Sequence, residues 1–504
     1  MRHESARCSS CLSQNLTQDQ NVLSLREREL LASILRHAQD CPAVGIPARS
    51  ERSACWVGEK AGDGVFFAVS NVKAYFSLEH AGTSFGREVV AGITTFVTMS
   101  YIIVVNPAIL KAAGIPAGPS MVATILTAVF GTLLMGLYAN RPFAIAPYMG
   151  ENVFIAYTVV QVLGYGWQTA LAAVFLGGTL FLVLTVLGLR QWLVEAIPSG
   201  LRYSFAVGIG LFLTFIGLNE TGIVMLGSAG APVRTGHLTT APVLAAVFGF
   251  LLMAALMIRR FPAAILLGIL VTTFLAFALR VAPPPNQWIS RPPSVAPIFL
   301  QMDFKGALTW GFFPVVLTIF VMAFVDTMGT LIGVSARAGF LDERGNLPQI
   351  ERPMLADALA TMFAASVGTT TSGAYIESAT GVEAGGRTGL TSVVTALCFV
   401  GTLFFSPFVA AIPAQAYGPA LIVVGLLMLA PITKIQFDDL TELIPAFAVV
   451  ALMSFTYNIG VGITAGFVLY PFCKVVSGRM AEVKPGVWVL AGVSLLFFIF
   501  YPYT

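Results

Sequence analysis

The stretch TTTSGAYIESATGVEAGGRTG, residues 369–389, decides how the rest of the chain is interpreted. It places two glutamates, Glu377 and Glu383, among hydroxyls and glycines in an otherwise apolar C-terminal half. Backbone that stops and restarts at membrane depth must be buried in protein or line a cavity, because lipid satisfies none of its N–H and C=O groups. A carboxylate at that depth is a functional-site hypothesis. A loop that is merely acidic is the competing interpretation.

The composition predicts a polytopic α-helical membrane protein. Of the 504 residues, 57% are hydrophobic and 11% are charged, and the mean hydropathy is +0.83. Soluble chains carry roughly twice that charged fraction. The motif Gly-Gly-Arg-Thr-Gly at 385–389 lacks the strand and the lysine of a phosphate-binding loop, so ATP-driven transport is not expected. The four histidines fall outside the apolar segments, so any proton coupling is expected to use carboxylates.

Fourteen apolar segments can be laid out along the chain, at or near the length that crosses a bilayer. They cover residues 89–106, 121–138, 146–163, 170–189, 201–218, 242–258, 262–281, 311–334, 354–367, 369–389, 390–412, 419–432, 443–457 and 459–475. Segment 3 opens on a Pro-Tyr-Met-Gly break, and segment 10 is the opening stretch. A last apolar piece, 487–501, either crosses, lies in the interface or docks on the bundle.

Lysine and arginine positions predict a cytoplasmic N-terminus. With that orientation the inner connections carry thirteen cationic residues, namely Arg141, Arg190, Arg202, Arg259, Arg260, Arg337, Arg344, Arg352, Arg387, Lys434, Lys474, Arg479 and Lys484. The outer connections carry five, namely Lys111, Arg234, Arg280, Arg291 and Lys305. Such an excess marks the cytoplasmic side. Residues 1–70 are polar and are expected to form a disordered cytoplasmic head without a cleavable signal peptide.

Two features predict an internal repeat. Ala-Ile-Pro introduces segment 5 at 196–198 and segment 12 at 411–413, a shift of 215 residues (411 − 196). The two breaks show a similar relation, since Asn152 follows the first and Glu377 follows the second, 225 residues later (377 − 152). Seven crossings in each half would invert the second copy. Paired broken helices in an inverted repeat are the best sequence indication of a transporter's binding site.

Segment 8 carries another intramembrane carboxylate. Asp326, Gly329, Thr330 and Gly333 are spaced i, i+3, i+4 and i+7, which places them on one small and polar helix face. We expect that face to meet the cavity. Close packing of a neighbouring helix against the glycines is the alternative.

Segments 3 and 10 supply the remaining candidates. Glu377 is expected in the first turn of a half-helix, where the dipole favours an anion. Asn152 can donate and accept hydrogen bonds and is the preferred site residue of segment 3. Its neighbour Glu151 points about 100° away and lies either at the rim of the site or in a cap. The acidic group between segments 12 and 13 is expected to be a solvated cytoplasmic cluster of Asp438, Asp439 and Glu442.

From about Tyr75 onward the chain resembles the AzgA-like adenine/guanine/hypoxanthine permeases, a branch of the nucleobase:cation symporter-2 superfamily. The resemblance depends on REVVAGITTFVTMSYIIVVNPAIL (87–110), LMGLYANRPFAIAPYMGENVF (134–154), FVDTMGTLIGV (324–334), YIESATGVEAGGRTGLTSVVTAL (375–397) and ELIPAF (442–447). The segment-10 signature of the uracil- and ascorbate-type branch is not found. Many members have Pro-Gly-Met-Gly-Leu-Asn-Ala where this chain has Pro-Tyr-Met-Gly-Glu-Asn-Val, so Tyr148 and Glu151 bear on base preference.

The resemblance implies an all-α polytopic membrane protein whose 14 transmembrane segments form a 7+7 inverted repeat with broken segments 3 and 10. It implies a core domain, 75–190 (segments 1–4) with 306–412 (segments 8–11). It also implies a gate domain, 191–282 (segments 5–7) with 413–476 (segments 12–14), before a tail at 477–504. In such proteins the core slides against the gate in an elevator-like motion, often within a homodimer. The family's binding positions match Asn152, Asp326 and Glu377, and a further family acid matches Asp438 or Asp439.

The resulting hypothesis is a proton-coupled importer of adenine, guanine or hypoxanthine in the cell membrane. Asp326 and Glu377 would accept hydrogen bonds from the base and carry the proton, Asn152 would hold the half-helix, and Phe154 or Tyr375 would stack on the ring. No cofactor, metal or nucleic acid is expected. The alternatives are a same-fold transporter of uracil, xanthine or an anion such as sulfate, a channel, and a membrane-embedded enzyme.

Overall fold

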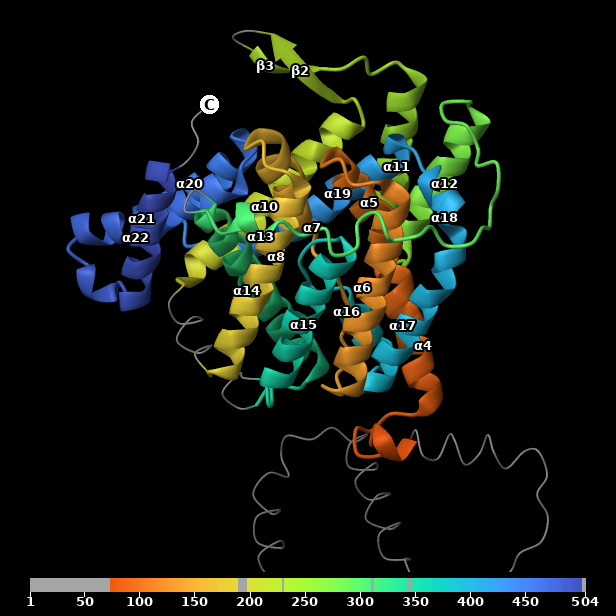
Figure 1. Ribbon diagram of the computed structural model, residues 1–504, viewed down its shortest axis with the longest axis horizontal. Coiled ribbons are helices and arrows are strands. Elements are labelled where there is room, and N and C mark those ends of the chain that lie inside the picture. The colour runs from red at the N-terminus through yellow and green to blue at the C-terminus, as the bar shows by residue number, and fades with distance from the viewer. Residues whose placement is uncertain (1–72, 189–196, 229–230, 310–311, 343–346, 501–504) are drawn as a thin grey trace, which may run out of the picture. The chain divides into compact units, whose positions relative to one another are not determined.

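The computed structural model describes residues 73–188, 197–228, 231–309, 312–342 and 347–500. All of them belong to one compact unit, Val65–Thr504. The head expected at 1–70 lies outside the described residues. Figure 1 shows a bundle of helices with a hairpin, β2 and β3, at one end.

The described helices follow the expected segments with shifted ends. The first half has α4 (Phe85–Met99), α5 (Ile102–Ala112), α6 (Ala117–Leu137), α8 (Trp167–Val186), α10 (Ser199–Glu220), α11 (Ala241–Ile258) and α12 (Ala264–Ala278). The second half has α13 (Phe304–Ala307), α14 (Phe313–Ala338), α15 (Glu351–Val367), α17 (Gly389–Thr402), α18 (Ser406–Ala410), α19 (Ala414–Met428), α20 (Leu440–Phe455), α21 (Ile459–Val476) and α22 (Pro485–Phe500).

Local residues explain several helix ends. Pro198 and Pro413, which end the two Ala-Ile-Pro motifs, are the N-caps of α10 and α19. Helix α14 ends at Gly339 and α15 at Gly368, whose φ angles of 69° and 96° lie in the left-handed region that glycine adopts without strain. Segment 1 is interrupted at Ser100 and Tyr101, between α4 and α5.

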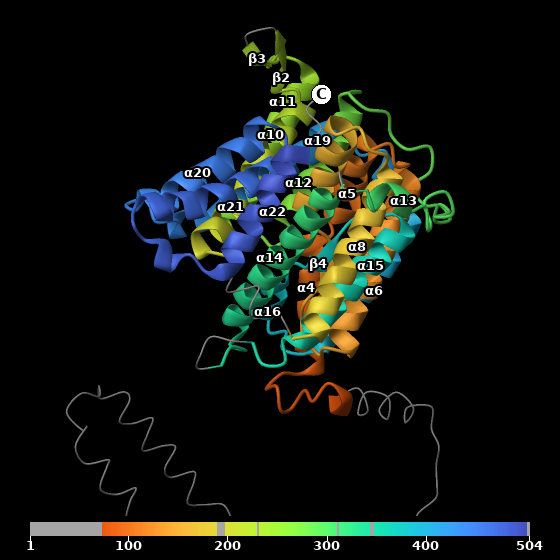
Figure 2. The ribbon, with the colours of Figure 1, turned by 60° about the vertical axis from the view of Figure 1, so that its left-hand side comes forward.

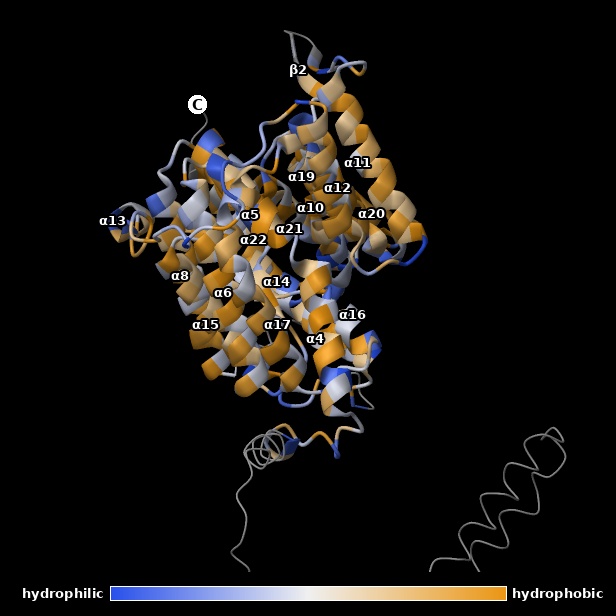
Figure 3. Ribbon diagram, turned by 90° about the vertical axis from the view of Figure 1, so that its right-hand side faces the viewer, coloured by the Kyte–Doolittle hydropathy of each residue, from blue (hydrophilic) through white to orange (hydrophobic). Residues whose placement is uncertain are grey.

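The protein is a mostly helical, polytopic membrane protein. Within the described ranges, nine helices are long and apolar enough to cross a bilayer, and three shorter apolar helices include α12 and α20. Figure 3 shows that hydrophobic residues cover most of the helical surface, whereas hydrophilic residues gather toward the helix ends and loops. The full count of fourteen crossings remains a prediction.

The expectation of an all-α fold needs correction, because two pairs of short strands are present. Strands β2 (Val224–Ser228) and β3 (Ala231–Thr235) form an antiparallel hairpin after α10. Strands β1 (Ile145–Pro147) and β4 (Ser372–Ala374) pair between the two interrupted segments. Broken segments need such pairing because their backbone groups lack helical partners.

Two sets of helices make most of their contacts among themselves. One set holds α4, α6, α8, α14, α15 and α17, and the other holds α10, α11, α12, α19, α20 and α21. Figure 2 separates α20 and α21 from α6, α8 and α15. Smaller contacts join the sets, for example α4 with α12 and α14 with α21. The boundary follows the predicted core and gate segments, and their assignment as moving domains remains a proposal.

Candidate functional site

The two interrupted segments meet through their strands. Strand β1 pairs antiparallel with β4, so that Ala146 lies opposite Gly373. After β1 come α7 (Met149–Val153) and the π-helix η1 (Phe154–Val162), and after β4 comes α16 (Ser378–Glu383). Every residue of the two strands is buried, so this short sheet lies inside the protein. Breaks separated by more than two hundred residues therefore form one centre.

Threonines on the surrounding helices bond to the broken backbone. Thr132 of α6 donates to the carbonyl of Ile145 at 3.1 Å and accepts from its N–H at 2.9 Å. Thr361 of α15 forms the same pair of bonds with Ser372, at 2.7 and 3.3 Å. These hydroxyls replace the partners that a continuous helix would have provided.

Glu377 lies at the start of α16, as its N-cap, one position before the expected first turn. Its carboxylate accepts a hydrogen bond of 2.5 Å from the Tyr101 hydroxyl. Tyr101 lies in the break between α4 and α5. The amino-acid sequence predicted neither this break nor a role for Tyr101. A tyrosine inside an apolar segment gave no local signal that it would face an acid 276 residues away.

Asn152 is buried and connects α7 to α5. Its amide donates to the Asn106 side-chain oxygen at 2.5 Å, and Asn106 donates to the hydroxyls of Thr124 and Thr369 at 2.7 and 3.0 Å. This network connects both broken segments to α5 and α6. The predicted role of Asn152 in holding the half-helix and its contact with a base both remain predictions.

Asp326 lies on a face of α14 that is open. An added Cβ atom at Gly329 or Gly333 would meet no atom within 4 Å, and both glycines are exposed. Among the described residues no helix packs tightly against them, which gives no support to the alternative of a glycine-mediated helix contact. Thr330 is half-buried on the same face. A polar helix face without a packed neighbour is what a cavity requires.

Asp357 is a further acid that the sequence analysis missed. It is buried on α15, and its Oδ2 accepts a hydrogen bond from the Thr327 hydroxyl on α14. The Thr327 hydroxyl also lies 3.1 Å from the Tyr148 hydroxyl. A single aspartate inside the predicted segment 354–367 was the available signal, because acids within membrane segments are rare and usually functional.

The two predicted aromatic residues are both buried. Tyr375 donates to the carbonyl of Pro147, and its ring lies nearly parallel to that of Tyr148, with 6.2 Å between centroids and 7° between planes. Phe154 begins the π-helix and packs in the main hydrophobic core. Tyr375 therefore joins the two breaks, and stacking of either ring on a base remains a prediction.

Glu151 lies in the first turn of α7. The N-cap of α7 is Tyr148, without a side-chain cap bond. The Glu151 side chain is wholly buried, and neither carboxylate oxygen forms a hydrogen bond with another residue of the described ranges. Helix α7 contacts α14, the helix that carries Asp326. The two possibilities from the sequence, a cap and the rim of the site, both remain predictions.

The acidic group before α20 lies apart from this centre. Asp439 is the N-cap of α20, where it accepts from the N–H of Thr441 at 2.9 Å and pairs with Arg479 at 2.6 Å. Bonds from Thr441 hold the pKa of Asp439 below its usual value. Lys474 lies 3.0 Å from Glu442. This is an ion-pair cluster that joins α20 to α21, and Asp438 beside it is exposed.

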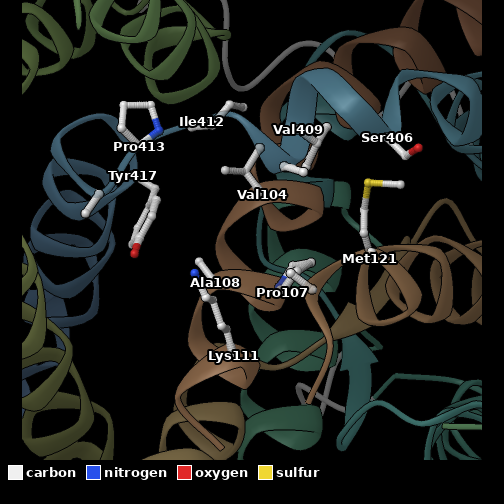
Figure 4. Close-up of a pocket in the computed structure, with 14 residues that line it drawn as sticks. Val104, Pro107, Ala108, Lys111, Met121, Ser406, Val409, Ile412, Pro413 and Tyr417 are labelled. Carbon is white, nitrogen blue, oxygen red and sulfur yellow. The ribbon is translucent and has the colours of Figure 1, made fainter. Parts of the chain in front are cut away.

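A cavity of about 270 Å³ lies between α5, α6, α18 and α19. Figure 4 shows Lys111 and Tyr417 at one side of it and Met121 and Ser406 at the other. None of the predicted site residues lines this cavity. Nearby, Glu220 accepts hydrogen bonds from Tyr157 and Tyr417, which links η1 to α10 and α19. No cluster of His, Cys, Asp and Glu within the described ranges could hold a metal ion.

Comparison with known proteins identifies relatives along most of the chain. A putative permease of Methanocaldococcus jannaschii is 46% identical over 85% of this chain and 98% of its own length. The adenine permease AdeP of Escherichia coli is 39% identical, covering 84% of this chain and 95% of AdeP. The guanine/hypoxanthine permease PbuG of Bacillus subtilis is 38% identical, covering 85% of this chain and all of PbuG.

The fold is also found among solved structures. The transmembrane domain of BicA, a cyanobacterial bicarbonate transporter, aligns with a TM-score of 0.56 at 15% identity, over 76% of this chain and 97% of that chain. At that identity the likeness concerns the fold. The sequence model described as the Permease family matches residues 86–469. The chain therefore belongs to the permease family that also includes adenine and guanine/hypoxanthine permeases.

Proposed function

We propose that the protein imports adenine, guanine or hypoxanthine across the cell membrane. The observation that carries the proposal is the pairing of two broken segments, next to Glu377 and in contact with α14, the helix of Asp326. The relatives of this chain are named as permeases of these purines. Carboxylates accept hydrogen bonds from a neutral base that is rich in N–H groups. They would repel an inorganic anion, which favours a purine over sulfate.

The proposed roles of the site residues follow their positions. Asp326, on the open face of α14, and Glu377, beside Tyr101, would accept hydrogen bonds from the base. Asn152 would hold α7 through the Asn106 network. Tyr375 or Phe154 would pack on the ring, and Thr330 would lie at the edge of the site.

Transport would proceed by sliding of the core domain, segments 1–4 and 8–11, against the gate domain, segments 5–7 and 12–14. The two helix sets, with few contacts between them, support this proposal. With a cytoplasmic N-terminus, the open face from Asp326 to Gly333 leads toward the inner side, because α14 ends there. A 7+7 inverted repeat and a homodimer form part of the same proposal.

Proton symport would use Asp326 or Glu377, since no histidine lies in the predicted segments. Uptake in cells should then fall when a protonophore collapses the proton gradient and should persist when sodium is replaced by choline. Uptake that follows sodium and ignores the protonophore would overturn proton coupling without affecting the assignment of the substrate.

The direct test is uptake of radiolabelled hypoxanthine and adenine by cells that lack their own purine permeases. The Glu377→Gln variant should lose most uptake, because glutamine cannot replace both charge and acceptor pair. Glu383→Gln is the matched control, since Glu383 lies on the same helix α16 but is 61% exposed. Full uptake by Glu377→Gln would refute the site, and no purine uptake by the unaltered protein would refute the function.

Competition defines the substrate class. Unlabelled adenine, guanine and hypoxanthine should reduce uptake of the labelled purine, whereas uracil and sulfate in equal excess should not. Inhibition by uracil or sulfate as strong as that by the purines would favour a same-fold transporter of another substrate.

A further inference from the structure

The two adjacent residues Glu151 and Asn152 extend into different surroundings. Asn152 bonds to Asn106 on α5. Glu151, the preceding residue, points about 100° away from Asn152 around the helix. Helix α7 also contacts α14, the helix that carries Asp326 and the open glycine face.

The acids around the breaks differ in their hydrogen-bond partners. Glu377 accepts from Tyr101, and Asp357 accepts from Thr327. Both oxygens of Glu151 are buried and form no hydrogen bond with another described residue. A buried carboxyl without partners is costly, so such a group in a binding centre indicates that a ligand supplies them.

The chemistry of the missing partner follows from the acceptor. An ionised carboxylate offers two adjacent acceptor oxygens and no donor, so its best partner presents two adjacent N–H groups. Guanine has such an edge, formed by N1–H and the 2-amino group. Hypoxanthine has N1–H without the amino group, and adenine places an acceptor nitrogen beside its amino group. A metal ion is a poorer fit, since the described acids form no cluster of metal-binding geometry.

We propose that Glu151 binds the N1–H and 2-amino edge of guanine and thereby selects guanine over hypoxanthine and adenine. This inference rests on the proposed function as a purine permease. Asp326, which forms no hydrogen bond with any described residue, then accepts from another N–H of the same base. Glu151 is a specificity-determining residue in this arrangement, and the other acids hold the centre or carry the proton.

The first experiment measures KM and maximal uptake rate for labelled guanine, hypoxanthine and adenine in the unaltered protein, Glu151→Gln and Glu151→Leu. Leucine and glutamine resemble glutamate in size, so the substitutions keep the volume of the side chain. A fluorescent tag measures the abundance of each variant in the membrane. We expect the guanine KM to rise about tenfold or more, because a polar site left unpaired discriminates strongly. The hypoxanthine KM should rise by a smaller factor than the guanine KM, because hypoxanthine offers Glu151 one N–H group and guanine offers two. Glu383→Gln is again the control.

The second experiment needs no variant and so does not depend on folding of one. Guanine, 1-methylguanine and N2-methylguanine compete with labelled hypoxanthine for the unaltered protein. Guanine should inhibit at least about tenfold more strongly than 1-methylguanine, which lacks the N1–H. Equal inhibition by the two compounds would overturn the proposal.

The outcomes separate the two claims. Purine uptake with an unchanged guanine-to-hypoxanthine ratio in both Glu151 variants overturns the role of Glu151 and leaves the permease assignment standing. Selective loss of adenine uptake overturns the choice of guanine, and an equal loss for all three purines shows a structural role. Absence of all purine uptake by the unaltered protein overturns the proposed function and this inference with it.

Discussion

Replacement of Glu88 by alanine should detach the loop that follows the half-helix α16. The Glu88 carboxylate is wholly buried on α4 and accepts from the N–H groups of Arg387, Thr388 and Thr391 at 2.8, 3.4 and 3.1 Å. The Thr391 hydroxyl donates a fourth bond of 2.6 Å. These donors surround the beginning of α17, where the helix dipole also favours an anion.

The magnitude follows from these four bonds. A hydrogen bond to a charged group contributes about 1.5–3 kcal/mol net, and donors left buried without partners add to the cost. Because the four bonds share one carboxylate, they are not additive. We expect Glu88→Ala to lower the free energy of unfolding by about 4 kcal/mol, and Glu88→Gln, which keeps one acceptor oxygen, by about 2 kcal/mol.

The assay is thermal denaturation of detergent-solubilised protein, followed by the fraction that stays monodisperse. Glu88→Ala should melt on the order of 5 °C below the unaltered protein, with Glu88→Gln between them. Glu79→Gln is the control, because Glu79 is exposed. A Glu88→Ala protein that melts within about 1 °C of the unaltered protein would refute the reasoning.

Three further changes test other parts of the molecule. Thr327→Val removes the hydroxyl that donates to Asp357, so initial purine uptake should fall about tenfold; normal uptake at normal abundance would contradict the contact's importance. Glu220→Gln removes the charged acceptor of two tyrosine hydroxyls, and the melting temperature should drop by about 2 °C; an unchanged value would show that the link adds no stability. Thr441 lowers the pKa of Asp439 in the folded protein. Asp439 therefore stabilises the fold at pH values above its unfolded-state pKa of about 4, and this stabilisation is lost as the pH falls through its lower folded-state pKa. The unaltered protein should therefore melt above Asp439→Asn at pH 7, and this difference should shrink below about pH 4; a constant difference would contradict the linkage.

Much of the candidate site could be predicted because its signal is local. Asp326 and Glu377 are acids in apolar surroundings. The breaks before Asn152 and Glu377 are marked by glycine, proline and hydroxyl-bearing residues. Asp357 had the same kind of signal and was missed. Tyr101 had none, since its contact with Glu377 depends on an interruption between α4 and α5 that no glycine or proline marks.

The amino-acid sequence by itself determined the class of the protein and the positions of its interrupted segments. It also singled out Asp326 and Glu377 as candidate acids. Apolar runs and costly polar residues are properties of short stretches, which is why these features could be read from the sequence. Only the tertiary structure decided what those residues meet. Pairing of β1 with β4, the open glycine face of α14 and the unpartnered carboxylate of Glu151 arise from contacts between distant segments. Such contacts depend on the packing of whole helices, which sets the partner of each buried polar group and leaves some groups for a ligand.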